Sequence, residues 1–287
     1  MKKYLLLVLV VLACKNFIQA ENKLPKVYLN HVSIVLDDVT FRGIAKSAFM
    51  TKKFANADAG LPKFVLPNDT SGLLYIRGKN TYVEIINANS LINAWKPGDI
   101  NIAFSAEQPN AAQQIYDSLF PALSPAKHPD SVNINGKQVA NEYYFGMPVS
   151  DMNTLFTYGI QEYHPDLMQA LYKKSFAGKP IKRSDFLKKR YNADKLLTDI
   201  TEINLEITEQ EATRFLETLK KLDFNVSEKN NSYVAKGNEI VFRIKITNEL
   251  QPKLQLKLKL NAPKDGNYNL NNSKLEFDGS YATWKFY

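Results

Sequence analysis

One order of elements recurs along the chain and constrains its fold more than any other feature. The first copy has an alternating strand at 28–37, an amphipathic helical stretch after it, and strands at 72–78 and 80–88. The second copy has a strand at 99–107, a helix that opens at Pro109, and two later strands, 138–146 and 154–164. Proline suits the first turn of a helix. Such long, few and degenerate copies predict paired modules rather than a solenoid.

A third copy begins with the strand at 200–208. Its helix has apolar side chains spaced three and four residues apart, as expected for a helix packed on a sheet: Ala212, Phe215, Leu216, Leu219 and Leu222. The last segment reads as strands without a helix, and the strict alternation of "KLQLKLKLN" at 253–261 is typical of an edge strand with outward lysines. Residues 199–287 are therefore predicted to form a degenerate third βαβ module with extra strands.

Composition describes an ordinary globular protein with a basic joint. The length of 287 residues suits one large or two modest domains, and 45% hydrophobic with 23% charged residues is usual for soluble chains. Much of the net charge of +8 lies at 173–190, where Asp185 is the sole acidic residue. No nucleic-acid recognition motif accompanies this charge. A solvated, basic helical linker at 166–198 is predicted, with no nucleic-acid partner.

The first twenty residues have the pattern of an export signal. Lys2 and Lys3 precede an apolar run at 4–13, which is shorter than the roughly 20 residues that span a bilayer. The single cysteine, Cys14, ends that run in a sequence that resembles a bacterial lipobox. Either 1–20 is a cleaved signal peptide, or 1–13 is a lipoprotein signal and Cys14 carries a lipid anchor. Both alternatives predict export to a bacterial cell envelope, as a periplasmic protein or a membrane-tethered outer-membrane lipoprotein.

The order of the modules, with "NHVSIVLDD" at 30–38 and "TYVEII" at 81–86, resembles the vicinal oxygen chelate superfamily. That superfamily includes glyoxalases, bleomycin-resistance proteins and extradiol dioxygenases. More narrowly, the chain is similar to secreted glyoxalase-like proteins of unknown function. The resemblance covers 27–165 and, less fully, 199–287. It implies an α+β fold in which paired βαβββ modules at 27–165 form a cupped mixed β-sheet.

The resemblance also implies a divalent metal in the cup, held by the first and last strands of each module. His31 and Glu84 match these places in the first module, and ungapped alignment puts Asn101 and Glu162 there in the second. His164 follows on the face of Glu162 and is a further candidate ligand. Such donors suit Zn, Fe, Mn or Ni, with Glu84 and Glu162 as proton-transferring catalytic groups. The amide of Asn101 is a poor ligand, which favours weak metal binding or none.

These residues leave three functions open. The first is a small-molecule binding module that binds metal weakly or not at all. The second is a metal-dependent lyase, isomerase or dioxygenase, and the third is a structural envelope lipoprotein. Aromatic side chains on the strands either pack in the core or form an apolar wall for a ligand: Tyr75, Tyr82, Tyr143, Tyr144, Phe145 and Tyr158.

The alternation of strand 28–37 predicts that His31 points into the cup, in contact with Glu84 and with Glu162 nearby. The alternative is that His31 is a hydrogen-bonded structural residue of the strand. Two inward carboxylates are expected to raise the pKa of the imidazole and hold it as a cation. In the third module Ile203 takes the place of the histidine and Arg243 that of the glutamate, which predicts no site there.

The lipid anchor leads to a direct test. Cys14→Ser should abolish fatty-acid labelling in a bacterial host, because Cys14 supplies the only thiol of the chain. Labelling is followed in cells and the processed protein is weighed by mass spectrometry. An intact wild-type protein that begins at Glu21 would contradict acylation and support cleavage by ordinary signal peptidase.

Overall fold

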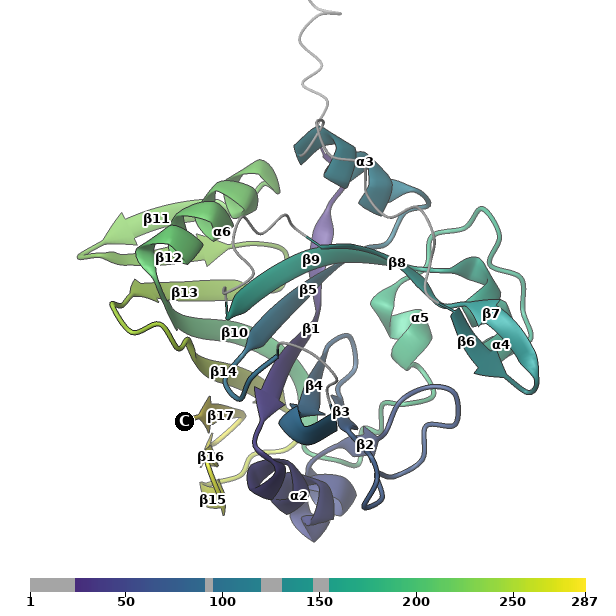
Figure 1. Ribbon diagram of the computed structural model, residues 1–287, viewed down its shortest axis with the longest axis horizontal. Helices are drawn as coiled ribbons and strands as arrows, with labels where there is room; N and C mark the ends of the chain where they lie inside the picture. Colours follow the sequence, from purple (N-terminus) through teal and green to yellow (C-terminus); the bar gives the residue numbers. More distant parts are fainter. Residues whose placement is uncertain (1–23, 91–94, 120–130, 147–154) are drawn as a thin grey trace, which may run out of the picture.

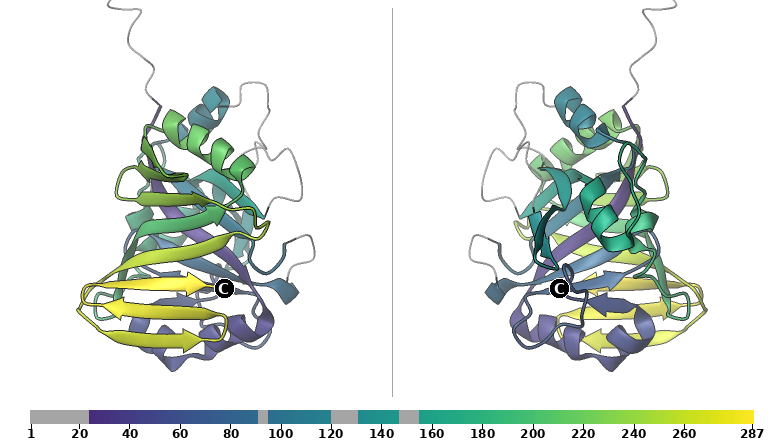
Figure 2. Two further views of the ribbon diagram at one scale, coloured as in Figure 1. Left: turned by 90° about the vertical axis from the view of Figure 1, so that its left-hand side faces the viewer. Right: turned by 90° about the vertical axis from the view of Figure 1, so that its right-hand side faces the viewer.

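Two mixed β-sheets, packed against each other, make up the computed structural model (Figures 1 and 2). It describes residues 24–90, 95–119, 131–146 and 155–287. The predicted signal segment and Cys14 lie outside these residues. In the described part of the chain, no helix is both long and apolar enough to cross a bilayer.

The first sheet contains the first two modules in the order β2-β3-β4-β1-β5-β9-β8. Its strands are β1 (Val27–Leu36), β2 (Asn56–Asp58), β3 (Leu73–Arg77), β4 (Tyr82–Asn87), β5 (Ile100–Ala106), β8 (Glu142–Gly146) and β9 (Phe156–Tyr163). Its helical elements are α2 (Asp38–Lys46), the π-helix η1 (Phe49–Phe54), the short 3-10 helix η2 (Ala88–Ser90) and α3 (Ala111–Leu119). A separate hairpin, β6 (Ser131–Ile134) and β7 (Lys137–Ala140), precedes β8.

The second sheet has the order β11-β12-β13-β10-β14-β17-β16-β15. Its elements are β10 (Leu197–Ile207), α6 (Glu209–Lys221), β11 (Asn225–Lys229), β12 (Ser232–Lys236), β13 (Val241–Ile246), β14 (Lys253–Leu260), β15 (Gly266–Leu270), β16 (Ser273–Asp278) and β17 (Tyr281–Phe286).

The first module has the same strand arrangement in both sheets, and the predicted α+β class with paired modules in a cupped sheet is confirmed. In the first, β1 runs parallel to β4 and antiparallel to β5, and in the second, β10 runs parallel to β13 and antiparallel to β14. The extra strands β14 to β17 thus occupy the place that the second module occupies in the first sheet. Because no helix crosses over between them, β17 returns antiparallel to β14, whereas β9 runs parallel to β5.

The prediction of an edge strand at 253–261 is wrong. β14 lies in the middle of its sheet, paired with both β10 and β17. Its alternation is real, since Leu254, Leu256 and Leu258 are buried while Lys257 is exposed. Outward lysines occur here on a central strand because one face of the sheet is solvated.

A continuous apolar core joins the two sheets. At its centre the ring of Phe215 on α6 packs against Phe242 of the second sheet (5.3 Å between centroids) and Phe156 of the first (5.1 Å). The helices α2, α3 and α6 lie around this interface, at the margins of the molecule (Figure 1). The outer face of the first sheet is therefore covered by a second sheet as well as by its own helices. Its opposite face is left free to form a cup.

Most lysines of the joint at 166–198 are exposed, as expected of a solvated segment, but the joint also contributes buried side chains. It contains α4 (Pro165–Tyr172) and α5 (Arg183–Leu187), which lie with the β6–β7 hairpin on the cup side of the first sheet (Figure 2, right). Arg183 is buried, and its guanidinium pairs with Glu107 at 3.0 Å and with Glu239 at 2.9 Å. One charged residue of this segment thereby ties the first sheet to the second.

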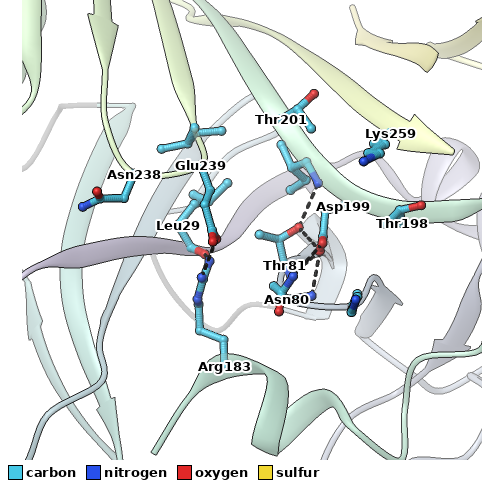
Figure 3. A pocket seen from close by; sticks show the side chains of 13 residues that line it. Leu29, Asn80, Thr81, Arg183, Thr198, Asp199, Thr201, Asn238, Glu239 and Lys259 are labelled. Carbon is cyan, nitrogen blue, oxygen red and sulfur yellow. Dashed lines mark hydrogen bonds and ion pairs between the residues drawn. The ribbon is translucent and has the colours of Figure 1, made fainter. Parts of the chain in front are cut away.

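A second polar contact joins the sheets beside a small cavity of about 250 Å³ (Figure 3). The carboxylate of Asp199 accepts hydrogen bonds from the backbone nitrogens of Asn80 (2.7 Å) and Thr81 (2.9 Å). Arg183 and Glu239 pair on the other side of the same cavity. These side chains already have partners across the joint, so the cavity is bounded by structural contacts.

The shared core predicts a single unfolding event. Phe215→Ala should lower the free energy of unfolding by about 3–5 kcal/mol, the usual cost of emptying a buried aromatic site. Both sheets should unfold together in denaturant, whether followed by far-ultraviolet circular dichroism or by the fluorescence of buried Trp284. Leu250→Ala, at an exposed site, is the control and should change little. Two separate transitions would contradict a shared core.

Candidate functional site

A cavity of about 380 Å³ opens on the free face of the first sheet. Both modules, the β6–β7 hairpin and α5 contribute to its wall. The lining residues are His31, Ala59, Leu61, Leu73, Tyr75, Arg77, Tyr82, Glu84, Asn101, Val132, Asn141, Glu142, Tyr144, Tyr163 and Phe186. We call this cavity the cup.

His31 and Glu84 come together on the floor of the cup. In the parallel pair β1–β4, Ser33 lies opposite Glu84. The Ser33 hydroxyl donates to Glu84 Oε2 at 2.6 Å, and His31 Nε2 lies 3.6 Å from the same oxygen. The ring of His31 stacks on that of Tyr82, with 4.6 Å between centroids. Alternation along β1 and β4 therefore places both predicted residues on the face inferred from the sequence.

A β-bulge adds Asn30, which the sequence pattern did not single out. The register between β1 and β5 shifts between Leu29 and His31. Such an extra residue can redirect a side chain. The amide of Asn30 contacts two residues of the cup. Its nitrogen donates to the Tyr163 hydroxyl at 3.2 Å, and its Oδ1 lies 3.0 Å from His31 Nδ1. With Oδ1 accepting the Nδ1 hydrogen, Nε2 is the acceptor nitrogen that faces Glu84.

The expectation of a cationic His31 is wrong. Burial above all, opposed by the charge of Glu84 and aided by that of Arg77, lowers the pKa of His31 to about 4. The side chain is almost fully enclosed, with 7% of the residue exposed. Removal of the charged form from water outweighs the attraction of one neighbouring carboxylate. At neutral pH His31 is therefore uncharged.

Arg77 forms a buried, neutralised cation in the cup wall. Its guanidinium makes two hydrogen bonds to Asp58, from Nε to Oδ2 at 3.1 Å and from Nη2 to Oδ1 at 3.0 Å. It also lies over the rings of Tyr75 (4.2 Å to the centroid) and Tyr82 (4.6 Å). Bidentate pairing and aromatic stacking offset the cost of burying this charge. No sequence signal pointed to this pair, since 19 residues separate its members.

The second module contributes amide and carboxylate groups. Asn101 Oδ1 accepts hydrogen bonds from the Tyr144 hydroxyl (3.0 Å) and from Thr157 Oγ1 (3.1 Å). Glu142 also lines the cup and accepts a hydrogen bond from Gln161 Nε2 at 2.8 Å. Asn101 thus lies in the cup as predicted from the alignment, but its oxygen is engaged by hydroxyl donors.

Glu162 lies on the other face of β9, so its expected position near His31 is wrong. Its carboxylate accepts hydrogen bonds from the backbone nitrogens of Asn110 (2.9 Å) and Ala112 (3.2 Å), at the start of α3. Negative charge is stabilised at a helix N-terminus. The alignment was shifted by one residue, and such a shift moves every side chain of a strand to the opposite face. Gln161 takes the cup-facing position.

His164 also lies elsewhere. β9 ends at Tyr163, and His164 caps α4 by accepting a hydrogen bond from the Asp166 backbone nitrogen at 3.2 Å. Pro165 begins that helix, which ends the strand pleat on which the predicted shared face depended.

The predicted aromatic wall is partly present. Tyr75, Tyr82 and Tyr144 line the cup, and Tyr163 and Phe186 join them. Tyr158 instead packs on Phe215 in the core between the sheets, with 4.8 Å between centroids. Tyr143 packs beside His164 at 5.1 Å. The side chain of Phe145 lies outside the described residues. Phe186 comes from the distant joint segment, so strand patterns gave no indication of it.

The residues present do not fit the divalent metal that the resemblance implies. Within the described ranges, no group of three or more His, Cys, Asp or Glu side chains is arranged to hold a metal ion. Of the expected ligands, His31 and Glu84 meet, while Glu162 and His164 serve as helix caps. Two donors leave the coordination sphere of a transition metal incomplete.

The corresponding face of the second sheet carries a groove of about 370 Å³ lined by more exposed side chains. There Asn204 lies opposite Arg243, as Ser33 lies opposite Glu84. Arg243 forms an ion pair with Glu202 at 2.9 Å. Ile203, which was matched to His31 from the sequence, is fully buried in the core. The match was again one residue out of phase.

Comparison with known proteins places the chain in a family. A family model described as a "family of unknown function (DUF5829)" matches residues 29–286. The chain belongs to this family. None of the curated proteins matches it.

Solved structures with a similar chain path include a hypothetical protein from Staphylococcus aureus, at 13% identity and a TM-score of 0.47, with 77% of this chain and 86% of that chain covered. Another is described as a "xylose isomerase-like TIM barrel/4-hydroxyphenylpyruvate dioxygenase fusion protein", at 13% identity and a TM-score of 0.44. The match covers 77% of this chain but only 32% of the fusion protein.

The lowered pKa of His31 predicts a pH effect on stability. In the unfolded chain the imidazole of His31 is protonated near pH 6.5, its ordinary pKa, whereas in the folded chain it is protonated only near pH 4. Stability from this group is therefore complete above the unfolded pKa and is lost as pH falls from about 6.5 toward 4. Between pH 7 and pH 5 the wild type should lose about 2 kcal/mol more than His31→Gln. Denaturant titrations at both pH values measure this, and equal losses would contradict a neutral, buried His31.

Proposed function

We propose that the protein binds a small organic molecule in the cup without the help of a metal. The observation that carries this proposal is the cavity of about 380 Å³ on which polar groups of both modules converge between aromatic rings. A largely preformed pocket with a few placed polar groups is what small-molecule sites generally present. The paired modules supply the two opposite walls.

The contrast between the two sheets supports a ligand over a purely structural role. Buried polar and charged groups cost free energy unless they are paired. The second sheet avoids most of that cost, because its corresponding face carries ion pairs such as Glu202–Arg243 in which the arginine side chain is 54% exposed. The first sheet instead encloses His31, Arg77 and Asp58 around an open volume. A sheet with no ligand to bind has no need of that arrangement.

Export belongs to the same proposal. The basic start, the apolar run at 4–13 and Cys14 support a binding protein of the bacterial cell envelope, tethered through a lipid if Cys14 is acylated.

Blocking the cup tests the proposal. A fragment library is screened by thermal melting and ligand-observed NMR against the wild type and against Leu73→Trp, which places an indole in the cup. Compounds that stabilise the wild type should bind Leu73→Trp at least tenfold more weakly, because the indole occupies their volume.

The matched control is Ser232→Trp. Ser232 lies opposite Lys245 on the second sheet as Leu73 lies opposite Ile86 on the first, so the two positions correspond. This variant should bind like the wild type. Compounds that bind Leu73→Trp unchanged would place binding outside the cup. Binding that disappears with a chelator would contradict the metal-free proposal.

A further inference from the structure

The joint between the sheets carries a dense group of positive charges. Residues 173–190 include eight basic residues and one acidic residue, Asp185. Six of the basic residues are exposed lysines: Lys173, Lys174, Lys179, Lys182, Lys188 and Lys189. The helices of the joint and the β6–β7 hairpin lie on the side of the molecule away from α6, β11 and β12 (Figure 1). The positive charge of this segment therefore faces solvent on one side of the protein.

The β6–β7 hairpin adds a seventh lysine to this group. Between α4 and the hairpin lies a groove of about 610 Å³, and its lining includes Lys137 of the hairpin together with Lys173 and Lys174. Lys137 is exposed, like the six lysines of the joint. We call these seven lysines the basic surface.

Aromatic side chains hold the parts of the basic surface together. The Tyr172 hydroxyl donates to the backbone oxygen of Phe186 at 2.6 Å, which ties the end of α4 to α5. The ammonium group of Lys189 lies over the Tyr172 ring, 5.0 Å from its centroid, and that of Lys174 lies 5.4 Å from the centroid of Phe176. A lysine stem packs along apolar surface while its charged end stays in water. The lysines that follow α4 and α5 thus lie around one aromatic centre.

The carboxylates nearby are engaged elsewhere. Glu107 pairs with the buried guanidinium of Arg183 at 3.0 Å. Asp185 accepts a hydrogen bond from the backbone at the start of α5 at 3.0 Å, and Asp166 lies 3.7 Å from Nδ1 of His164. Within the ranges that the structure describes, no ion pair joins a lysine of the basic surface to a carboxylate. Seven like charges held close together repel one another, and an anionic partner would relieve that repulsion.

We propose that the basic surface docks on the anionic headgroups of a lipid membrane. Clusters of about four to eight basic side chains bind such headgroups through charge attraction. A lipid surface presents many negative charges over a broad area, so it can meet all seven lysines at once. A small anion in the groove would meet only Lys137, Lys173 and Lys174. Lysine ammonium groups act as mobile point charges and need no fixed geometry in their partner.

This surface is separate from the interior of the cup and adds a partner to the proposed small-molecule function. None of its seven lysines lines the cup. However, α5 contributes Phe186 to the cup wall, and Lys188 and Lys189 directly follow that helix. Docking of the basic surface would therefore bring the cup close to the membrane.

Vesicle binding tests the proposal on the full chain. Every sample carries Cys14→Ser, so that no acyl chain contributes, and vesicles of phosphatidylcholine measure the binding that does not depend on charge. Vesicles of phosphatidylcholine and phosphatidylglycerol in equal amounts should bind the protein at least tenfold more tightly in cosedimentation, because the lysines then meet negative headgroups. This difference should shrink at high salt, since salt screens exposed charges. Equal binding to both kinds of vesicle would overturn the proposal.

Two variants with the same change in net charge locate the contact. The first combines four substitutions in the basic surface and should bind the anionic vesicles at least tenfold more weakly: Lys137→Gln, Lys173→Gln, Lys174→Gln and Lys189→Gln. The control removes four exposed lysines of α6, β11 and β12, on the opposite side of the molecule, and should bind within about twofold of the wild type: Lys220→Gln, Lys221→Gln, Lys229→Gln and Lys236→Gln.

The outcomes with these variants decide where the membrane binds. Unchanged binding of the first variant, or an equal loss in the control, would overturn the proposal, because binding would then follow other residues or the net charge alone. All eight substitutions are at exposed positions, where little stability is lost, and thermal melting checks that both variants are folded.

Nucleic acid is the competing anionic partner. A double-stranded DNA oligonucleotide that binds more tightly than the anionic vesicles, and through the same four lysines, would overturn membrane docking. Leu73→Trp should bind the vesicles like the wild type, because Leu73 lines the cup and not the basic surface. Failure of vesicle binding would thus leave the small-molecule function standing, and an empty fragment screen would leave membrane docking standing.

Discussion

Burial of one face of each sheet against the other is the constraint on which the rest of the structure depends. The aromatic contacts around Phe215 remove that face from water and leave the opposite faces free. Since side chains alternate along a strand, the same packing that buries Val32 and Ile34 directs His31 and Ser33 outward. The site is thus positioned by the core behind it.

The two sheets show how similar strand arrangements yield two different surfaces. Each has paired modules that meet at their first strands, yet only the first sheet has the β6–β7 hairpin and α5 on its free face. These elements contribute Val132 and Phe186 to the cup, and they turn an open face into a cavity. On the second sheet, Glu202 and Arg243 meet near water, where an ion pair contributes little. The shape of the cup therefore depends on the added elements rather than on the sheet alone.

Several polar and charged side chains are buried around the cup, and their removal from water costs free energy. A neutral His31 and the enclosed Arg77–Asp58 pair are held where water cannot solvate them. Replacement of such a pair by apolar residues is often neutral or stabilising in other proteins, so its presence needs a reason other than stability. The proposed binding of a small molecule supplies one, because groups fixed in advance lose little freedom when a ligand binds.

The sequence by itself determined the features that depend on local pattern. The order of strands and helices, the amphipathic helix around Phe215, and the shared face of His31 and Glu84 all follow from the spacing of apolar residues within one element. Tertiary structure decided the features that depend on register or on distant partners. A one-residue phase error moved Glu162 to α3, and a bulge brought Asn30 to the imidazole. Strand pairing, which sets the register, and the fold of the joint, which brings in Phe186, are fixed by contacts between segments far apart in the chain, so no local window of sequence reveals them.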